Sequence, residues 1–111
     1  MSNELVSDAS VQAALDWLRD EADAIGEAKR DAFKTEHMIR HVKALAMKQH
    51  MELPVSAQER EAYASPQYVE AIDRAADAAG EFEKKRSLRE AAQSRIEVWR
   101  SAGANYRAMK L

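Results

Sequence analysis

Two histidines in the first half of the chain have the spacing of a zinc-binding pair. His37 and His41 stand four residues apart, so on a helix both side chains would point to the same side. Met38 occupies the position where metalloproteases with this spacing carry their catalytic glutamate, and no third ligand is apparent. We therefore expect two solvated side chains, and we expect His50 to cap carbonyl groups near a helix end.

Residue types needed for other chemistry are missing or scattered. The chain has no cysteine, which excludes a disulfide framework, a thiolate zinc site and a cysteine nucleophile. It has no G-x-S-x-G sequence and no glycine-rich loop that would hold phosphate. Its carboxylates alternate with lysine and arginine, as on exposed helix faces. The sequence therefore predicts a protein that is not an enzyme and that uses neither a metal nor a cofactor.

Basic residues near the end of the chain are the main candidates for a binding surface. Four of them cluster within six positions, and the others interleave with two aromatic residues. Such a pattern suits single-stranded nucleic acid, because cations hold phosphates and aromatic rings stack on bases. The candidate residues for contact with nucleic acid or a protein partner are Lys84, Lys85, Arg86, Arg89, Arg95, Trp99, Arg100, Tyr106 and Arg107.

The distribution of charge gives the same basic stretch a second interpretation. Residues 1–35 hold eight acidic and four basic side chains, whereas residues 81–111 hold four acidic and eight basic side chains. In an antiparallel pair of helices the acidic beginning would lie beside the basic end, and the summed attraction would favour that register. The formal net charge of −2 does not decide between the two interpretations, which can both hold.

Composition predicts an all-α fold. Three glycines and two prolines leave few chain reversals, whereas an all-β domain needs a turn about every ten residues. Aromatic residues make up only 6% of the chain, so large anchors for a thick core are few. We expect a thin helical core within a single domain, residues 1–111.

A heptad pattern predicts a first helix over roughly residues 8–50. The companion positions are less regular, because Glu21, Thr35 and Gln49 interrupt them. The helix is therefore better defined than a coiled-coil seam. It should end before Pro54, which cannot continue it. The seven-residue stripe consists of Val11, Leu18, Ile25, Ala32, Ile39 and Ala46.

Two serines predict where the next helices begin. Ser56 and Glu59 have the spacing of a capping box, which predicts a short helix over 57–64. Ser65, followed by proline, predicts the N-terminus of a last helix over 66–107. The expected apolar stripe of that helix, with a loss of phase over residues 83–87, consists of Tyr68, Ile72, Ala75, Ala79, Phe82, Leu88, Ala92, Ile96, Trp99 and Tyr106.

The two long helices are expected to form an antiparallel hairpin joined by the short helix. With helix ends near 50 and 66, each residue of the first helix would lie opposite the residue numbered roughly 116 minus its own number. Trp17 and Trp99 would then be neighbours. A lone hairpin buries little surface, so we expect two or more chains to assemble into an oligomeric helical bundle.

The sequence shows no signal for export or for a membrane. Residues 1–5 do not combine a basic segment with an apolar core, and no apolar run is long enough to span a bilayer. We expect the protein to remain in the cytoplasm and to bind no membrane.

Two stretches of the chain resemble a known group of proteins. Residues 58–68 read QEREAYASPQY, and residues 90–100 read EAAQSRIEVWR and continue to Asn105-Tyr106-Arg107. Together they resemble small, helical, largely uncharacterised proteins of tailed phages and prophages that are encoded near recombination and replication genes. The resemblance is looser over residues 8–50. It implies a bacterial host and a role in DNA metabolism, and it carries over no catalytic residue.

These observations predict a non-enzymatic accessory or adaptor protein of a phage-type DNA recombination or replication module. It would act through contact with a protein or through single-stranded DNA held by the basic last helix. The alternative is a protein-directed module, either an inhibitor of a host factor or a virion-assembly component, that binds no nucleic acid.

Overall fold

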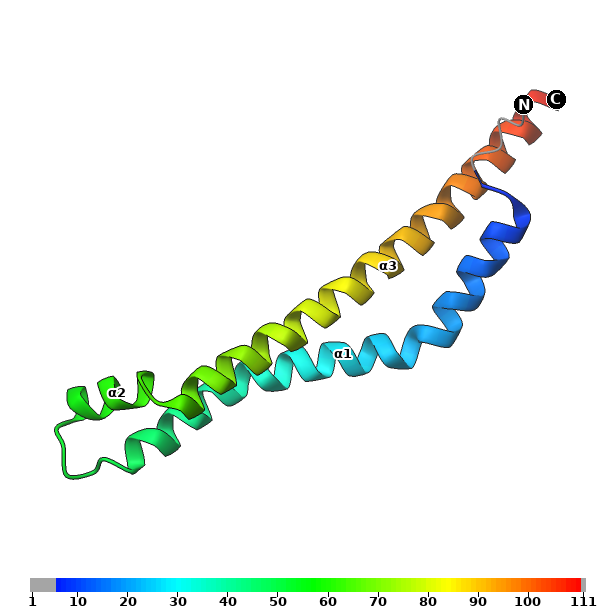
Figure 1. The fold of residues 1–111 in the computed structure, drawn as a ribbon. Coiled ribbons are helices and arrows are strands. Elements are labelled where there is room, and N and C mark those ends of the chain that lie inside the picture. Colours follow the sequence, from blue (N-terminus) through cyan, green and yellow to red (C-terminus); the bar gives the residue numbers. More distant parts are fainter. Residues whose placement is uncertain (1–5, 111) are drawn as a thin grey trace. The chain divides into compact units, whose positions relative to one another are not determined.

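The computed structural model describes residues 6–110, which form three α-helices and no strand (Figure 1). The helices are α1 (Asp8–Lys48), α2 (Val55–Tyr63) and α3 (Pro66–Lys110). The all-α prediction is confirmed. The starts of α1 and α3 fall at the predicted residues, and the other four helix limits differ from the predicted ones by one to three residues. Expectations for residues 1–5 and 111 lie outside the described residues. Along the described part of the chain, no helix combines the length and the apolar character that a membrane crossing needs.

The chain divides into two compact units, and both contain a part of α1 and a part of α3. Unit 1 combines Met1–Ile25 with Lys84–Leu111, and unit 2 is Gly26–Glu83. α1 and α3 each continue from one unit into the other as an unbroken helix, whereas α2 belongs to unit 2 alone.

One side of α1 faces inward. A set of buried and half-buried positions recurs on this helix at alternating spacings of three and four residues, which is the pattern of a coiled-coil seam. We call these positions the seam. The predicted seven-residue stripe is confirmed, and the less regular companion positions belong to the seam as well. The seam of α1 consists of Val11, Ala14, Leu18, Glu21 and Ile25 in unit 1, and of Ala28, Ala32, Thr35, Ile39, Val42 and Ala46 in unit 2.

α3 has a seam with the same spacing, but it departs from the predicted stripe. The predicted loss of phase is wrong, because Lys85 and Arg89 continue the seam as half-buried basic residues. Apolar residues of α3 occupy both the seam and the face beside it. The sequence is therefore compatible with two apolar stripes, and the predicted stripe combined residues of both. The stripe residues that are exposed instead are Ile72, Ala79, Leu88 and Tyr106. The seam of α3 consists of Tyr68, Ala71, Ala75, Ala78 and Phe82 in unit 2, and of Lys85, Arg89, Ala92, Ile96 and the partly exposed Trp99 in unit 1.

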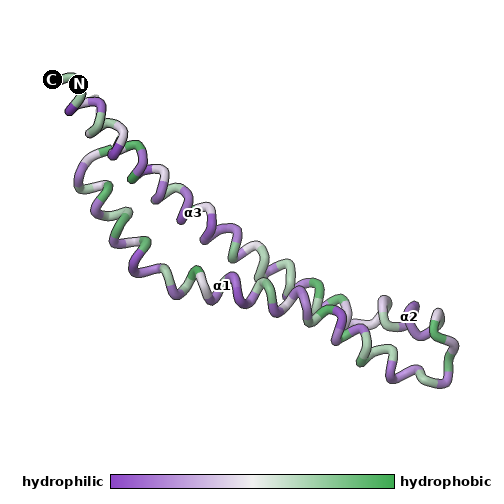
Figure 2. Tube along the Cα trace, turned by 180° about the vertical axis from the view of Figure 1, so that it is seen from behind, coloured by the Kyte–Doolittle hydropathy of each residue, from purple (hydrophilic) through white to green (hydrophobic). Residues whose placement is uncertain are grey.

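The core along the seam is thin. Eight hydrophobic residues are buried among those described, and six of them are alanine. Val11 and Ile25 are the largest, and no large side chain is fully buried. Green and purple segments alternate along both long helices in Figure 2, as expected where apolar positions recur every three or four residues. Hydrophobic stabilisation is proportional to the apolar area that is buried, so the hydrophobic contribution to the stability of each unit is small.

α2 is held against the end of α1 by a cluster around one lysine in unit 2. The ammonium of Lys43 donates a hydrogen bond of 2.8 Å to the hydroxyl of Tyr63 and lies 4.5 Å from the centroid of that ring. Glu59 adds an ion pair at 3.8 Å. The Tyr63 ring meets Tyr68 of α3 edge to face, with the centroids 5.2 Å apart. The hydrogen bond to Tyr63 raises the pKa of Lys43, because it favours the charged ammonium.

Within unit 2, α1 and α3 lie side by side and run in opposite directions (Figures 1 and 2). A groove of about 480 Å³ is lined by residues of the α1 range 34–42 and the α3 range 67–74. A second groove, of about 230 Å³, joins Val42 and Ala46 to Gln67. Val42 therefore lies near residue 67, whereas the expected register placed it near residue 74. The offset arises because α2 packs against the last turns of α1. The start of α3 therefore lies beside Val42 rather than beside the C-terminal end of α1.

Serine caps explain where two of the helices begin. Ser65 accepts a hydrogen bond of 3.2 Å from the backbone amide of Tyr68, which confirms its predicted role as the N-cap of α3. Ser7 accepts a similar bond of 3.1 Å from the amide of Ser10 at the start of α1. The capping box at Ser56 is wrong: α2 begins at Val55, two residues before the predicted start at residue 57, and its start has no side-chain cap.

Replacing Ser65 with alanine is expected to destabilise the protein by about 1 kcal/mol, because the amide of Tyr68 loses its capping acceptor. Ser56→Ala is the matched control, since Ser56 is an exposed serine inside the first turn of α2. Its free energy of unfolding is expected to change by less than about 0.5 kcal/mol. Urea unfolding followed by circular dichroism measures both values. Equal losses in the two variants would contradict the observed helix starts.

Candidate interaction surface

The nine candidate residues all lie on α3 within unit 1, but they do not share one face. Successive residues of a helix are about 100° apart. At that rotation Lys84 and Arg95 fall on one side of α3, whereas Arg86 and Arg100 fall on nearly the opposite side. The structure therefore separates the basic residues that the sequence analysis grouped together.

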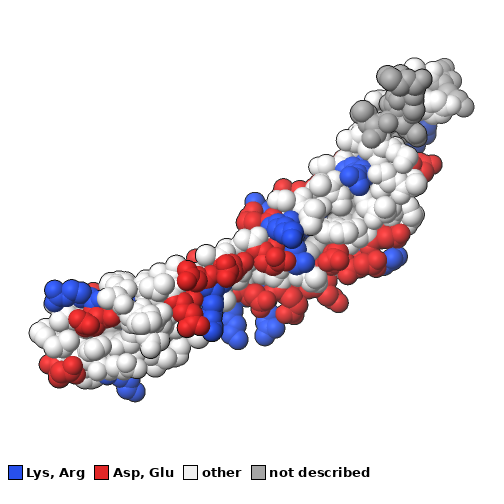
Figure 3. Space-filling model, in the orientation of Figure 1, with Lys and Arg blue, Asp and Glu red and all other residues white. Residues whose placement is uncertain are grey.

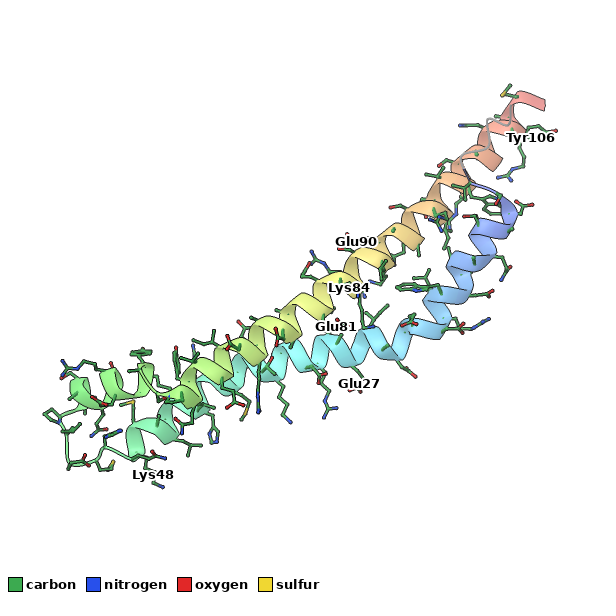
Figure 4. The ribbon with its side chains drawn as sticks, viewed as in Figure 1. Glu27, Lys48, Glu81, Lys84, Glu90 and Tyr106 are labelled. Carbon is green, nitrogen blue, oxygen red and sulfur yellow. The ribbon has the colours of Figure 1, made fainter. Side chains whose placement is uncertain are left out.

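Arg86 and Arg100 belong to a flank on which both signs of charge alternate. Arg86 forms an ion pair of 3.7 Å with Glu90, and Arg100 forms one of 3.0 Å with Glu97. Figure 4 labels Glu90 on this part of α3. Such exposed pairs contribute little stability, but they offset the positive charge of this flank. We call the exposed residues Arg86, Glu90, Gln93, Glu97 and Arg100 the mixed-charge flank.

Lys85 and Arg89 are only half-buried, because they occupy seam positions. On α1 the seam of unit 1 also contains one half-buried charged residue, Glu21. Charged residues at seam positions lower the stability of a helix pair and help to fix its register. These two cations are therefore part of the helix packing in unit 1 rather than of an open binding face.

Trp99 is tied to the beginning of α1. Its indole N–H donates a hydrogen bond of 2.7 Å to a carboxylate oxygen of Asp8, and 43% of the residue stays exposed. Trp17 lies nine residues further along α1, about 13 Å of helix rise from Asp8. The predicted contact between the two tryptophans is therefore wrong. Trp17 is half-buried beside Leu18, as expected at the edge of the seam.

Tyr106 and Arg107 are exposed on the last turns of α3, and Tyr106 is 60% exposed. α1 begins at Asp8, which contacts Trp99, so both residues lie beyond the point where α3 meets the start of α1. Of the residues predicted to interleave, Trp99 thus lies in the seam, Arg100 on the mixed-charge flank and Arg107 on the last turns. Arg95 and Tyr106 share one side of α3 but are eleven residues apart.

The exposed side of α3 next to the seam carries a different pattern. Five exposed residues recur there at spacings of four and three, within an arc of about 80°. Leu88 is 48% exposed and Val98 is 38% exposed. Neither Lys84 nor Arg95 forms an ion pair with another described residue, and the set contains no acidic side chain. We call Lys84, Leu88, Ala91, Arg95 and Val98 the Lys84–Val98 strip.

Sequence reasoning missed the apolar members of the Lys84–Val98 strip. Leu88 was assigned to the buried stripe, and Ala91 and Val98 were given no role. The sequence does contain a pattern that could have indicated the strip. Residues 84, 88, 91, 95 and 98 follow one another at helical spacings of four and three, and none of them is acidic. Figure 3 shows red and blue atoms close together over much of one face of the molecule, so charge composition alone does not locate such a strip.

The histidines and the acidic end of α1 show no metal-binding arrangement. No group of three or more histidine or carboxylate side chains suited to a metal occurs among the described residues. His37 and His41 are exposed, and the His37 ring lies 4.2 Å from that of Phe33.

On α1 in unit 1, the hydrogen bond from Arg19 to Asp20 raises the pKa of the exposed Arg19.

Comparisons with known proteins give no relative. No protein-family model, curated protein or solved structure matches this chain. The likeness to phage proteins thus rests on the two stretches of sequence alone, and a function must be argued from the exposed faces of α3.

In a Trp17→Phe background, Asp8→Ala is expected to shift the fluorescence of Trp99 to longer wavelength. The indole N–H loses its carboxylate partner, so the ring becomes more exposed to water. Asp23→Ala is the control, because Asp23 is an exposed acidic residue of α1 in the same unit. Emission spectra of both variants at neutral pH provide the measurement. If Asp8→Ala behaves like the control, then the contact between α1 and Trp99 is absent in solution.

Proposed function

We propose that the protein is a non-enzymatic adaptor that acts through helix–helix contact with a protein partner. One observation carries the proposal: large apolar side chains stand on exposed helix faces, while six of the eight buried hydrophobic residues among those described are alanine. Exposed apolar faces of this kind are typical of surfaces that bind another protein. Leu88 and Val98 are such residues, and they stand beside two cations without acidic partners.

For the whole chain we propose an antiparallel hairpin that assembles with further helices into an oligomeric bundle. The opposite directions of α1 and α3 in unit 2 support the hairpin. The thin core supports the bundle, because helices that face a bundle are apolar beyond the two seam positions of each heptad. Met38 and Leu45 extend the apolar face of α1 in this way, and Ile72 extends that of α3.

The setting that we propose is a phage-type DNA recombination or replication module in a bacterial cell. This part of the proposal follows from the resemblance of residues 58–68 and 88–107 to phage proteins. An inhibitor of a host factor or a virion-assembly component would use the same helix–helix contacts. The three roles share the mode of action and differ in the partner.

Photocrosslinking tests the adaptor proposal. A Val98→benzoyl-Phe variant is expected to give one dominant protein adduct in bacterial cells, because position 98 lies on the Lys84–Val98 strip. Gln93→benzoyl-Phe on the mixed-charge flank is the control and is expected to give little. With purified protein alone, a crosslinked dimer would support the oligomeric bundle. An absence of adducts at position 98, or equal adducts at both positions, would overturn the adaptor proposal.

Single-stranded DNA binding is a second candidate function. The exposed cations Lys84 and Arg95 favour it, because neither has an ion-pair partner among the described residues. Two features weigh against it, since stacking and phosphate contacts must occur along one track. The indole of Trp99 is held by Asp8, and Tyr106 lies eleven residues beyond Arg95, about 16 Å along α3. The protein-directed function is therefore the better supported of the two.

A fluorescence anisotropy titration with labelled single-stranded DNA tests this second function. If it holds, Lys84→Ala combined with Arg95→Ala weakens binding and lowers the slope of log affinity against log salt by about 1.4, the value for two phosphate contacts. Lys48→Ala combined with Arg60→Ala removes two exposed cations of unit 2 and serves as the charge-matched control. Wild-type protein that binds no DNA at low salt leaves only the protein-directed function.

A further inference from the structure

We infer that the Lys84–Val98 strip docks an acidic amphipathic helix of a partner protein. The inference rests on the proposed adaptor function and adds the chemistry of the partner. It concerns unit 1 alone, since all five residues belong to the α3 part of that unit.

The apolar part of the strip has the shape of a helix-docking face. Leu88 and Val98 are ten residues apart, so about 15 Å of helix separates them. Ala91 lies between them on the same side and is exposed, and Arg95 follows it one turn later. A small residue between two larger ones lets a second helix approach closely. Helix-in-groove recognition uses apolar anchors at such helical spacings.

The charged part of the strip selects an acidic partner. Lys84 and Arg95 are eleven residues apart, which is close to three full turns, so both lie on the same side of α3. The nearby acidic residues Glu90 and Glu97 are on the mixed-charge flank, where each pairs with an arginine. The strip itself therefore presents two positive charges and no negative one. A partner helix with carboxylates eleven residues apart would meet both cations at once.

The acidic face of α1 in a second copy of the chain fits the strip less well. The acidic face of α1 in unit 1 contains Asp16, Asp20 and Asp23, which recur at helical spacing. No large apolar residue stands among these three, so this face would leave Leu88 and Val98 without an apolar counterpart. Asp16 and Asp20 are also both within ion-pair distance of Arg19.

Single-stranded DNA fits the strip less well for a different reason. The apolar members of the strip are leucine, alanine and valine, which have no flat ring on which a base can stack. Trp99, one turn beyond Arg95, is held by Asp8, and Tyr106 lies on the same side but about 16 Å further along α3. Two cations about 16 Å apart along α3 would also contact few phosphates. The strip therefore matches a helix with apolar and acidic residues better than it matches a nucleic acid.

The test uses the full-length protein and three labelled helical peptides. The peptides share one apolar face and carry glutamate, glutamine or lysine at two flanking positions eleven residues apart. Fluorescence anisotropy at physiological salt is expected to show that the glutamate peptide binds about threefold to tenfold more tightly than the glutamine peptide, as two exposed charge pairs allow. The lysine peptide is expected to bind most weakly.

Variants of the protein assign the preference to the strip. Lys84→Glu combined with Arg95→Glu is expected to reverse the order of the three peptides. Leu88→Asp combined with Val98→Asp is expected to abolish binding of all three. Arg86→Glu combined with Arg100→Glu, on the mixed-charge flank, is the charge-matched control and is expected to preserve the order. All six positions are exposed, and circular dichroism checks that each variant stays helical.

Three results would overturn the inference. The first is no saturable binding of the glutamate peptide, or equal binding of all three peptides. The second is tighter binding of single-stranded DNA that depends on the same two cations. The third is an adduct at position 98 that contains only a second copy of the chain. If position 98 gives a dominant adduct with another protein but all three peptides bind equally, the adaptor function is retained. Only the inference that the partner is an acidic helix is then rejected.

Discussion

The alanine content of the seam is the constraint on which the other features depend. Five of the seven buried residues on the described parts of α1 and α3 are alanine, so these helices enclose little space for large side chains in either unit. Leucine, valine, isoleucine and phenylalanine therefore appear on exposed faces, where a compact domain would have buried them. In a protein with a thicker core these side chains would be buried. Here they are available for contact with another helix. The interaction surfaces thus follow from the same composition that makes the core thin.

The docking of α2 sets the offset between the two long helices. Lys43, Tyr63 and Tyr68 link the three helices of unit 2 through a hydrogen bond, a cation–π contact and an edge-to-face ring pair. α2 thereby covers the last turns of α1, and α3 begins beside Val42. Unit 1 shows an offset in the same direction, because Trp99 meets Asp8 instead of Trp17.

Sequence patterns predicted the helices well and their pairing poorly, for identifiable reasons. The heptad stripe on α1 was readable because an apolar residue recurs at every seventh position from Val11 to Ala46, and Ser65 was readable because proline follows it. On α3 the stripe was assigned partly to the wrong residues, since Ile72 and Ala79 stand next to the seam and are as apolar as it is. The register failed because a contact such as Lys43 with Tyr63 joins helices and leaves no periodic signal.

The candidate surface changed because charge can be counted in a sequence but cannot be assigned to a face without the phase of the helix. Once the seam passes through Lys85 and Arg89, those two cations belong to packing, and Arg86 falls on the flank where glutamates offset it. Lys84 and Arg95 then remain together, and Leu88 stands between them as an exposed apolar residue. A surface that combined cations with aromatic rings would have favoured DNA. Cations combined with exposed aliphatic side chains favour a helix that supplies both carboxylates and apolar contacts.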